Sequence, residues 1–371
     1  MQVAVLKETA TRENRVALTP DSAGRLLKSK VDVVVQRGAG ERAGFPDVAY
    51  AALGVHLADD ASSACAGARI ALKVQPPSDS EIALLESGSV LVSFLRPGQQ
   101  AAASLARKLS ERGVSALALE LVPRITRAQT MDVLSSQSTV TGYKAVLLGA
   151  SEIGKFLPML TTAAGNIQPA RVFVIGAGVS GLQAIATARR LGGVVSAFDV
   201  RPAAREQVLS LGATFVAAES VSASAETAGG YARDQSEDER AKTLAAIAAH
   251  IKDVDLVITT AQVPGKPSPR LIAASVVQTM RPGSVIVDLA AENGGNCELT
   301  RADEIVHAHG VTILGPVNLA STLPYHASQM FGRNVLSLLQ HLIGKDGTLT
   351  IDATDEITGA MLITHDGKVL K

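Results

Sequence analysis

The stretch VFVIGAGVSGLQAIATARRL, residues 172–191, decides the fold of this chain. It begins as an apolar run typical of a buried strand and ends with the residue spacing of a helix. Between them, Gly176, Gly178 and Gly181 form a G-x-G-x-x-G pattern. In that pattern the first glycine permits a tight turn, the second lets the backbone approach a pyrophosphate, and the third allows close helix–strand contact. Strand, glycine turn and helix together predict a dinucleotide site in which helix N–H groups face the phosphates.

Apolar runs on both sides of this stretch extend the pattern to two sheets. Five runs follow it, and because they are continuous rather than alternating they predict a buried parallel sheet of the doubly wound type. Four shorter runs precede it in the rhythm of β/α units. The later runs are VVSAFDV (194–200), ATFV (213–216), DLVITTA (255–261), SVIVDLA (284–290) and VTILG (311–315), and the earlier ones are 2–6, 32–35, 69–74 and 89–94. The sequence predicts an α/β protein with two Rossmann-like domains.

The order of these runs also suggests the domain organisation, and a length of 371 residues suits two domains. Residues 127–164 carry apolar side chains at helical spacing and predict a long connecting helix. A second helical stretch, 327–342, follows the last strand of the second domain and can return to the first. We therefore expect a discontinuous N-terminal domain, 1–132 plus 327–371, and a dinucleotide-binding domain, 133–326.

Asp199 ends the strand after the glycine turn, at about the 20-residue spacing of the acid that holds an adenosine ribose. Its carboxylate can accept from a 2′-hydroxyl and repels a 2′-phosphate, which favours NAD(H) over NADP(H). Arg201 works against this inference because an arginine there can attract a phosphate, and a simple strand-end cap is the plainer alternative for Asp199. The expected cofactor contacts are Gly176, Ala177, Gly178, Val179, Ser180, Gly181, Asp199, Val200 and Arg201.

Composition excludes several other classes of function. The 35 basic and 35 acidic residues leave no net charge, and aromatic residues are 3% without Trp, so nucleic-acid binding is not expected. The two cysteines, Cys65 and Cys297, form no disulfide framework and fit a reducing cytoplasm. We expect neither a signal peptide nor a membrane-spanning helix. His307 and His309 lack an acidic or thiolate neighbour, so we predict exposed histidines and no metal site.

The run RITRAQTMDVLSSQS (124–138) closely resembles the signature loop of the NAD(H)-binding component, domain I, of proton-translocating nicotinamide nucleotide transhydrogenases. GGYA (229–232) is similar to that family's mobile loop, and 258–271 and 287–300 support the resemblance, which covers essentially the whole chain. It implies that Arg124, Gln129, Asp132 and Ser135 contact the nicotinamide side of NAD(H), and that Tyr231 belongs to a loop that closes over the cofactor. A capping network at the start of the helix after Asp132 is the alternative for the first set.

Alanine dehydrogenases share this fold family, together with ENRVALTP (13–20) and Lys73. In them the strand that matches 91–95 leads into a catalytic histidine, whereas this chain has Arg96, and their later acid corresponds to Glu292. Histidine exchanges protons near neutral pH and arginine does not, so position 96 disfavours oxidative deamination. Arg15 and Lys73 are either remnants of a substrate-carboxylate site or surface cations, and we leave them out of the catalytic set.

The resemblance implies a subunit that passes a hydride from its NADH to NADP⁺ on a partner, coupled to proton translocation. Membrane-spanning and NADP(H)-binding subunits would complete the enzyme, and the component is a homodimer in that family. It would be cytoplasmic, held at the bacterial inner membrane through its partners without inserting itself. Alanine dehydrogenase and a non-catalytic NAD(H)-binding protein are the alternatives.

Overall fold

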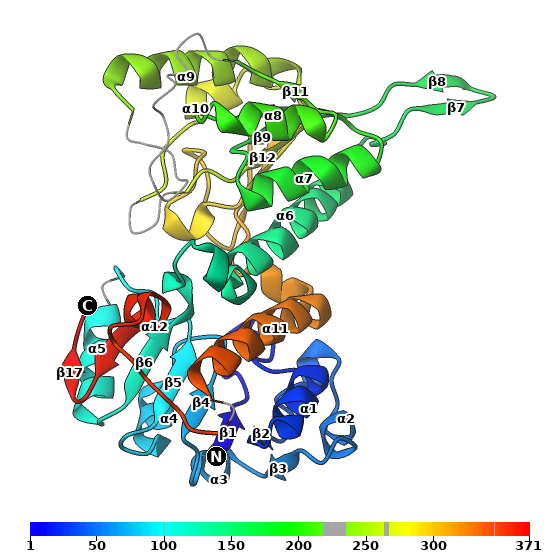
Figure 1. Cartoon of the computed structure of the whole chain (residues 1–371). Coiled ribbons are helices and arrows are strands. Elements are labelled where there is room, and N and C mark those ends of the chain that lie inside the picture. The colour runs from blue at the N-terminus through cyan, green and yellow to red at the C-terminus, as the bar shows by residue number, and fades with distance from the viewer. Residues whose placement is uncertain (100, 218–234, 263–266, 345) are drawn as a thin grey trace. The chain divides into compact units, whose positions relative to one another are not determined.

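The computed structural model describes residues 1–99, 101–217, 235–262, 267–344 and 346–371. These residues form two compact units, one of 1–137 with 320–371 and the other of 138–319 (Figure 1). We call them unit 1 and unit 2. Each is an α/β unit on a mainly parallel sheet, which confirms the predicted fold class.

The described residues of unit 1 form an eight-stranded sheet in the order β17-β16-β6-β5-β4-β1-β2-β3. Six of these strands are parallel and have the doubly wound order, while β16 and β17 add an antiparallel edge. Helix α11 buries Phe331, Val335 and Leu339 in the core of this unit. The elements are β1 (Gln2–Val5), α1 (Pro20–Lys28), β2 (Asp32–Gln36), α2 (Asp47–Ala51), β3 (His56–Ala58), α3 (Ala61–Cys65), β4 (Ile70–Leu72), α4 (Asp79–Leu84), β5 (Val90–Ser93), α5 (Ala102–Glu111), β6 (Ser115–Ala118), α11 (Pro324–Leu342), α12 (Glu356–Met361), β16 (Leu362–His365) and β17 (Lys368–Val369), with 3-10 turns η1 (Glu41–Ala43), η2 (Leu119–Leu121) and η3 (Thr126–Met131).

The described residues of unit 2 form a seven-stranded sheet in the order β11-β10-β9-β12-β13-β15-β14. All neighbours are parallel except β14 and β15. The strand order reverses between β9 and β12, and ligands of doubly wound sheets bind at the carboxyl ends of the strands at such a point. The elements are α6 (Val133–Glu152), which begins in unit 1, β7 (Leu160–Thr162), β8 (Gly165–Ile167), β9 (Arg171–Ile175), α7 (Val179–Arg190), β10 (Val194–Phe198), α8 (Ala203–Ser210), β11 (Thr214–Phe215), α9 (Glu237–His250), β12 (Leu256–Thr259), α10 (Ala274–Val277), β13 (Val285–Asp288), β14 (Ile305–Ala308) and β15 (Val311–Leu314), with 3-10 turns η4 (Ile251–Asp253), η5 (Ala291–Asn293) and η6 (Leu319–Thr322), the last reaching into unit 1.

Strand β9 shows why the decisive stretch is a continuous apolar run. Val172 and Val174 pack into one hydrophobic cluster and Phe173 and Ile175 into another, on opposite faces of the sheet. All four are essentially inaccessible to solvent. Because helices cover both faces, neither set of alternating positions tolerates polar residues.

One sequence expectation about local structure was wrong, and the apolar runs did not predict every strand. The connecting helix predicted over 127–164 is confined to α6, because Gly154 and Pro158 interrupt the helical spacing and an exposed β7–β8 hairpin follows. Strand β14 was missed because it is an antiparallel edge strand whose side chains are largely exposed, so it lacks the apolar run used to find strands.

Candidate functional site

The glycine turn joins β9 to α7 at the point where the strand order reverses. Gly176 has φ of 96°, and a Cβ atom there would lie 2.5 Å from Thr260 Oγ1. The Thr260 hydroxyl donates to the Gly176 carbonyl at 3.0 Å and fixes the turn. At Gly181 a Cβ atom would lie 1.8 Å from the Gly176 carbonyl oxygen, so helix and turn meet closely. Two of the three glycines are therefore required by the backbone itself.

Gly178 differs because a Cβ atom there would have no atom of the described residues within 4 Å. It is the residue before α7, so the first N–H groups of the helix adjoin this open space. Such a space beside the first N–H groups of a helix suits a phosphate, since the helix N-terminus carries partial positive charge. The turn thus fits the pyrophosphate of a dinucleotide.

Asp199 lies at the carboxyl end of β10, buried to 6% exposure, and connects the turn to Arg201. Its Oδ2 accepts the Ala177 N–H at 2.7 Å, and its Oδ1 accepts the Arg201 backbone N–H at 2.8 Å. The Arg201 guanidinium adds two further bonds of 2.9 Å, one to each oxygen. The carboxylate is more than a strand-end cap, because it holds the second residue of the glycine turn.

The remaining cofactor residues predicted in this region lie at the start of α7 and just after β10. Ser180 donates to the Ser138 carbonyl at 3.0 Å, and Val179 is exposed. Val200 is half-buried and packs on the apolar cluster around Phe198. Tyr231 lies outside the described residues.

Sequence reasoning missed two buried residues that shape the neighbouring loops of unit 2. Asp288 ends β13 and accepts five bonds, from the N–H groups of Ala290, Asn296 and Cys297 and the hydroxyls of Thr259 and Thr300, at 2.6–3.0 Å. Asn296 in turn donates to the Ala261 and Pro269 carbonyls, both at 2.8 Å. These bonds tie together the loops that follow β12 and β13. The only sequence signal was an acid at the end of an apolar strand.

The four residues assigned to the nicotinamide side lie between η2 and the first turn of α6. Asp132 precedes α6, and its carboxylate accepts the Ser135 N–H at 2.9 Å and the Ser135 hydroxyl at 2.6 Å. This is the helix-capping network considered as the alternative, so both residues have a structural role whatever they bind. Arg124 and Gln129 are exposed, whereas Asp132 and Ser135 are half-buried.

Arg15 and Lys73 are not surface cations, because they are 4% and 1% exposed. Lys73 Nζ lies 2.7 Å from Glu81 Oε1 and 3.6 Å from Glu8 Oε2. Burial raises the pKa of Glu8 to about 7, although Lys73 and the Val74 N–H oppose the rise. Each buried cation therefore faces carboxylates of this chain.

The pKa of Glu13 is lowered, in contrast to that of Glu8. Burial alone would raise its pKa, but the hydrogen bonds and charge of Arg15, together with a bond from Gln75, lower it to about 2. The two Arg15–Glu13 side-chain bonds are 2.8 and 2.7 Å long. Glu13 is therefore ionised throughout the physiological range.

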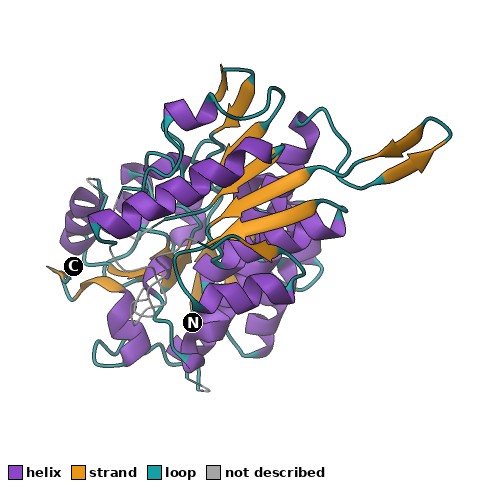
Figure 2. Cartoon of the chain, turned by 90° about the horizontal axis from the view of Figure 1, so that it is seen from above, coloured by secondary structure: helices purple, strands orange, loops and turns teal. Residues whose placement is uncertain are grey.

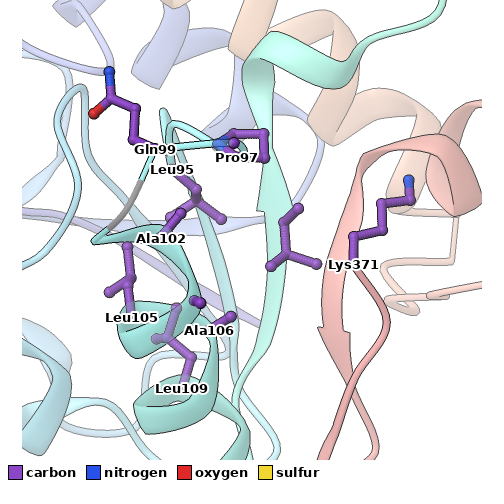
Figure 3. A pocket seen from close by; sticks show the side chains of 11 residues that line it. Leu95, Pro97, Gln99, Ala102, Leu105, Ala106, Leu109 and Lys371 are labelled. Atoms are coloured by element: carbon purple, nitrogen blue, oxygen red, sulfur yellow. The ribbon is translucent and has the colours of Figure 1, made fainter. Parts of the chain in front are cut away.

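A separate pocket of about 280 Å³ lies in unit 1, beside α5 and β16, and none of the predicted site residues lines it. Figure 3 shows the apolar side chains of Leu105, Ala106 and Leu109 on one side and Lys371 on the other.

Glu292 is exposed and accepts the Asn318 N–H. His307 and His309 are exposed, as predicted. Within the described ranges, no group of His, Cys, Asp and Glu could hold a metal ion.

Comparison with known proteins covers the whole chain. The alanine dehydrogenase/PNT N-terminal domain model matches residues 4–141, and the C-terminal domain model matches 145–371. The chain is 44% identical to the first part of NAD(P) transhydrogenase subunit alpha of Rhodospirillum rubrum, over 100% of this chain and 98% of that protein. It is 31% identical to alanine dehydrogenase of Halomonas elongata, over 100% and 94%. A solved transhydrogenase of Sinorhizobium meliloti superposes with a TM-score of 0.91 and 42% identity, over the full length of both chains.

Proposed function

The chain belongs to the alanine dehydrogenase/PNT family, and from that premise we propose that it is the NAD(H)-binding component of a proton-translocating NAD(P) transhydrogenase. The observation that carries the choice within the family is Arg96. Its guanidinium follows β5 and donates to Gln75 Oε1 at 2.7 Å. It cannot exchange protons near neutral pH, as the histidine of alanine dehydrogenases does. The greater identity to transhydrogenase subunits agrees with this choice.

NAD(H) would be held by unit 2, in the proposed dinucleotide-binding domain. The open space at Gly178 would receive the pyrophosphate, with N–H groups of α7 facing its oxygens. Asp199 would accept a hydroxyl of the adenosine ribose in exchange for a bond from the Arg201 guanidinium, and Val179, Ser180 and Val200 would lie beside the cofactor. When bound as NADH, the cofactor supplies a hydride whose passage to NADP⁺ yields NAD⁺ and NADPH.

The proposed nicotinamide residues would position the cofactor rather than titrate. Arg124 offers a fixed cation, Gln129 an amide with donors and an acceptor, and Asp132 with Ser135 a carboxylate and a hydroxyl. The Asp132–Ser135 bonds hold those two side chains in one orientation. Direct hydride passage needs no protein acid or base, so fixed polar groups suit it.

The partners in this proposal are an NADP(H)-binding subunit and a membrane-spanning subunit. Helices of the described residues are all too short or too polar to span a bilayer. In this proposal the chain works on the cytoplasmic face of the inner membrane, attached through these partners. A separate subunit would provide the path for protons.

We also propose that two copies of the chain associate through unit 2. The β7–β8 hairpin stands out from the rest of that unit in both views (Figures 1 and 2). Phe156 and Met159 just before it are 55% and 61% exposed, and Ile167 at its end is 39% exposed. Large apolar side chains on a projecting hairpin are typical of a surface that a second chain covers.

A reconstitution experiment tests the proposed function. The purified chain is mixed with an NADP(H)-binding transhydrogenase component, and NADPH formation from NADH and NADP⁺ is followed. We expect formation only when both proteins are present. Binding of NADH without transfer would favour the non-catalytic alternative, and turnover of L-alanine with NAD⁺ would favour alanine dehydrogenase.

A further inference from the structure

Five polar side chains of unit 1 form a continuous chain of hydrogen bonds. Arg96 donates to Gln75 at 2.7 Å, and Gln75 donates to Glu13 at 2.7 Å. Arg15 donates to both carboxylate oxygens of Glu13, and its Nη1 donates to Gln137 Oε1 at 2.8 Å. All except Arg96 are buried. Segments far apart in the sequence are thus joined by one defined geometry.

The chain of bonds ends on the helix that carries some of the proposed nicotinamide residues. Gln137 lies on α6, two residues after Ser135, and its amide donates to the Ala327 carbonyl at 3.1 Å and to the Ser136 hydroxyl at 3.3 Å. The Arg15 bond therefore fixes the side of α6 just beyond the Asp132–Ser135 cap. A displacement of the Arg15 side chain would therefore displace Gln137 and, with it, the Asp132–Ser135 cap.

The other end of the chain of bonds is held in an unfavourable backbone conformation. Arg96 has φ of 54°, in the left-handed region that favours glycine. The Glu120 carboxylate accepts the N–H groups of both Leu95 and Arg96 and thereby stabilises the turn. Strain of this kind persists only where surrounding contacts determine the backbone.

Stability alone does not account for this arrangement. A buried ion pair such as Arg15–Glu13 loses the hydration of two charges, and apolar residues of similar volume often stabilise a protein equally well. Charged and amide groups also form directional hydrogen bonds, which fix the orientation of each side chain relative to the next one between Arg96 and Gln137. A directional chain of bonds that reaches the start of α6 suits the placement of reacting groups.

We propose that Arg15 is a positioning residue for hydride transfer, acting through Gln137 on the first turn of α6 and so on Asp132 and Ser135. This inference rests on the proposed function. In this role Arg15 acts through its bonds to Glu13 and Gln137. It sets the orientation from which the proposed nicotinamide residues act.

The test uses Arg15→Lys and Gln137→Met in the reconstituted complex. Lysine keeps the charge beside Glu13 but lacks the planar fork that serves Glu13 and Gln137 together. Methionine keeps the volume of Gln137 without its acceptor. We expect kcat for transfer to fall about tenfold or more in either variant, with KM for NADH within about twofold. Arg25→Lys, on the exposed face of α1, is the matched control and should change neither.

The double variant shows whether the two residues act through one bond. We expect Arg15→Lys/Gln137→Met to lose no more than the worse single variant, whereas independent effects would multiply. Hydrogen exchange gives a second readout without a partner: amides of 133–137 should exchange faster in Arg15→Lys, with 183–187 of α7 unchanged.

Several results would overturn the inference. In the kinetic assay, these are an unchanged kcat in both single variants, a loss of kcat matched by an equal rise in KM, or losses that multiply in the double variant. In the exchange experiment, it is an unchanged rate of amide exchange at residues 133–137 in Arg15→Lys. Failure of the proposed function is distinguishable, because the unmodified chain would then transfer no hydride at all.

Discussion

The guanidinium of Arg201 contacts both oxygens of Asp199, at 2.9 Å from each. The acid expected to accept the adenosine ribose is thus paired with the arginine that could instead attract a 2′-phosphate. The preference for NAD(H) inferred from Asp199 and the attraction of a phosphate inferred from Arg201 therefore depend on the same contact. The planar guanidinium orients the carboxylate by bonding to both of its oxygens.

Asp199→Asn should narrow the preference for NADH over NADPH. Asparagine can still accept one N–H bond through its amide oxygen, but it no longer repels a phosphate, and it releases Arg201 to attract one. We expect NADH binding to weaken by about tenfold and NADPH binding to tighten. Fluorescence titration with both nucleotides measures this, and Asp59→Asn at an exposed position is the control. An unchanged ratio of the two affinities would exclude Asp199 from specificity.

Alanine substitutions at Gly178 and Gly181 should separate cofactor binding from folding. At Gly178 the new methyl group meets no atom of the residues that the structure describes, so stability should change by less than about 1 kcal/mol while NADH affinity falls. At Gly181 it would collide with a backbone carbonyl, and we expect a loss of more than about 2 kcal/mol. Urea unfolding and NADH titration of both variants measure the two effects. Equal NADH affinity of Gly178→Ala and the unmodified chain would place the pyrophosphate elsewhere.

Glu8→Gln should flatten the pH dependence of stability. The pKa of Glu8 is raised from 4.5 to about 7, so between these values the folded chain binds more protons than the unfolded chain. Its contribution is therefore present at low pH and is lost as pH rises toward 7. Glutamine removes this slope. Unfolding free energies measured from about pH 4.5 to about pH 8 test it, and parallel curves for the two proteins would refute the shift.

The chain should show no alanine dehydrogenase activity. Arg96 remains charged and hydrogen-bonded to Gln75, so no group at that position can take and return a proton. Incubation with L-alanine and NAD⁺, followed by absorbance of NADH, measures this. Turnover of about one per second, slow but ordinary for an enzyme, would assign the chain to the other branch of the family.

Local patterns predicted the features that depend on neighbouring residues. The glycine turn and Asp199 follow from a strand, a turn and a helix in sequence, and the Asp132–Ser135 cap follows from two polar residues three apart. Burial of Arg15 and Lys73 could not be predicted in the same way. It depends on partners such as Glu81 and Gln137, which only the folded sheet brings together. Asp288 and Asn296 were missed for the same reason, since their partners lie on loops after different strands.

Transfer of an isotopic label tests the central claim most directly. NADH deuterated at both hydrogens of nicotinamide C4 is bound to the purified chain, and NADP⁺ is bound to an NADP(H)-binding transhydrogenase component. After mixing in ordinary water, mass spectrometry of the NADPH formed measures its deuterium content. We predict that every NADPH carries one deuterium, because the hydride passes directly between the two nicotinamides without exchange with solvent. NADPH without deuterium, or no NADPH from the mixed proteins, would contradict direct transfer.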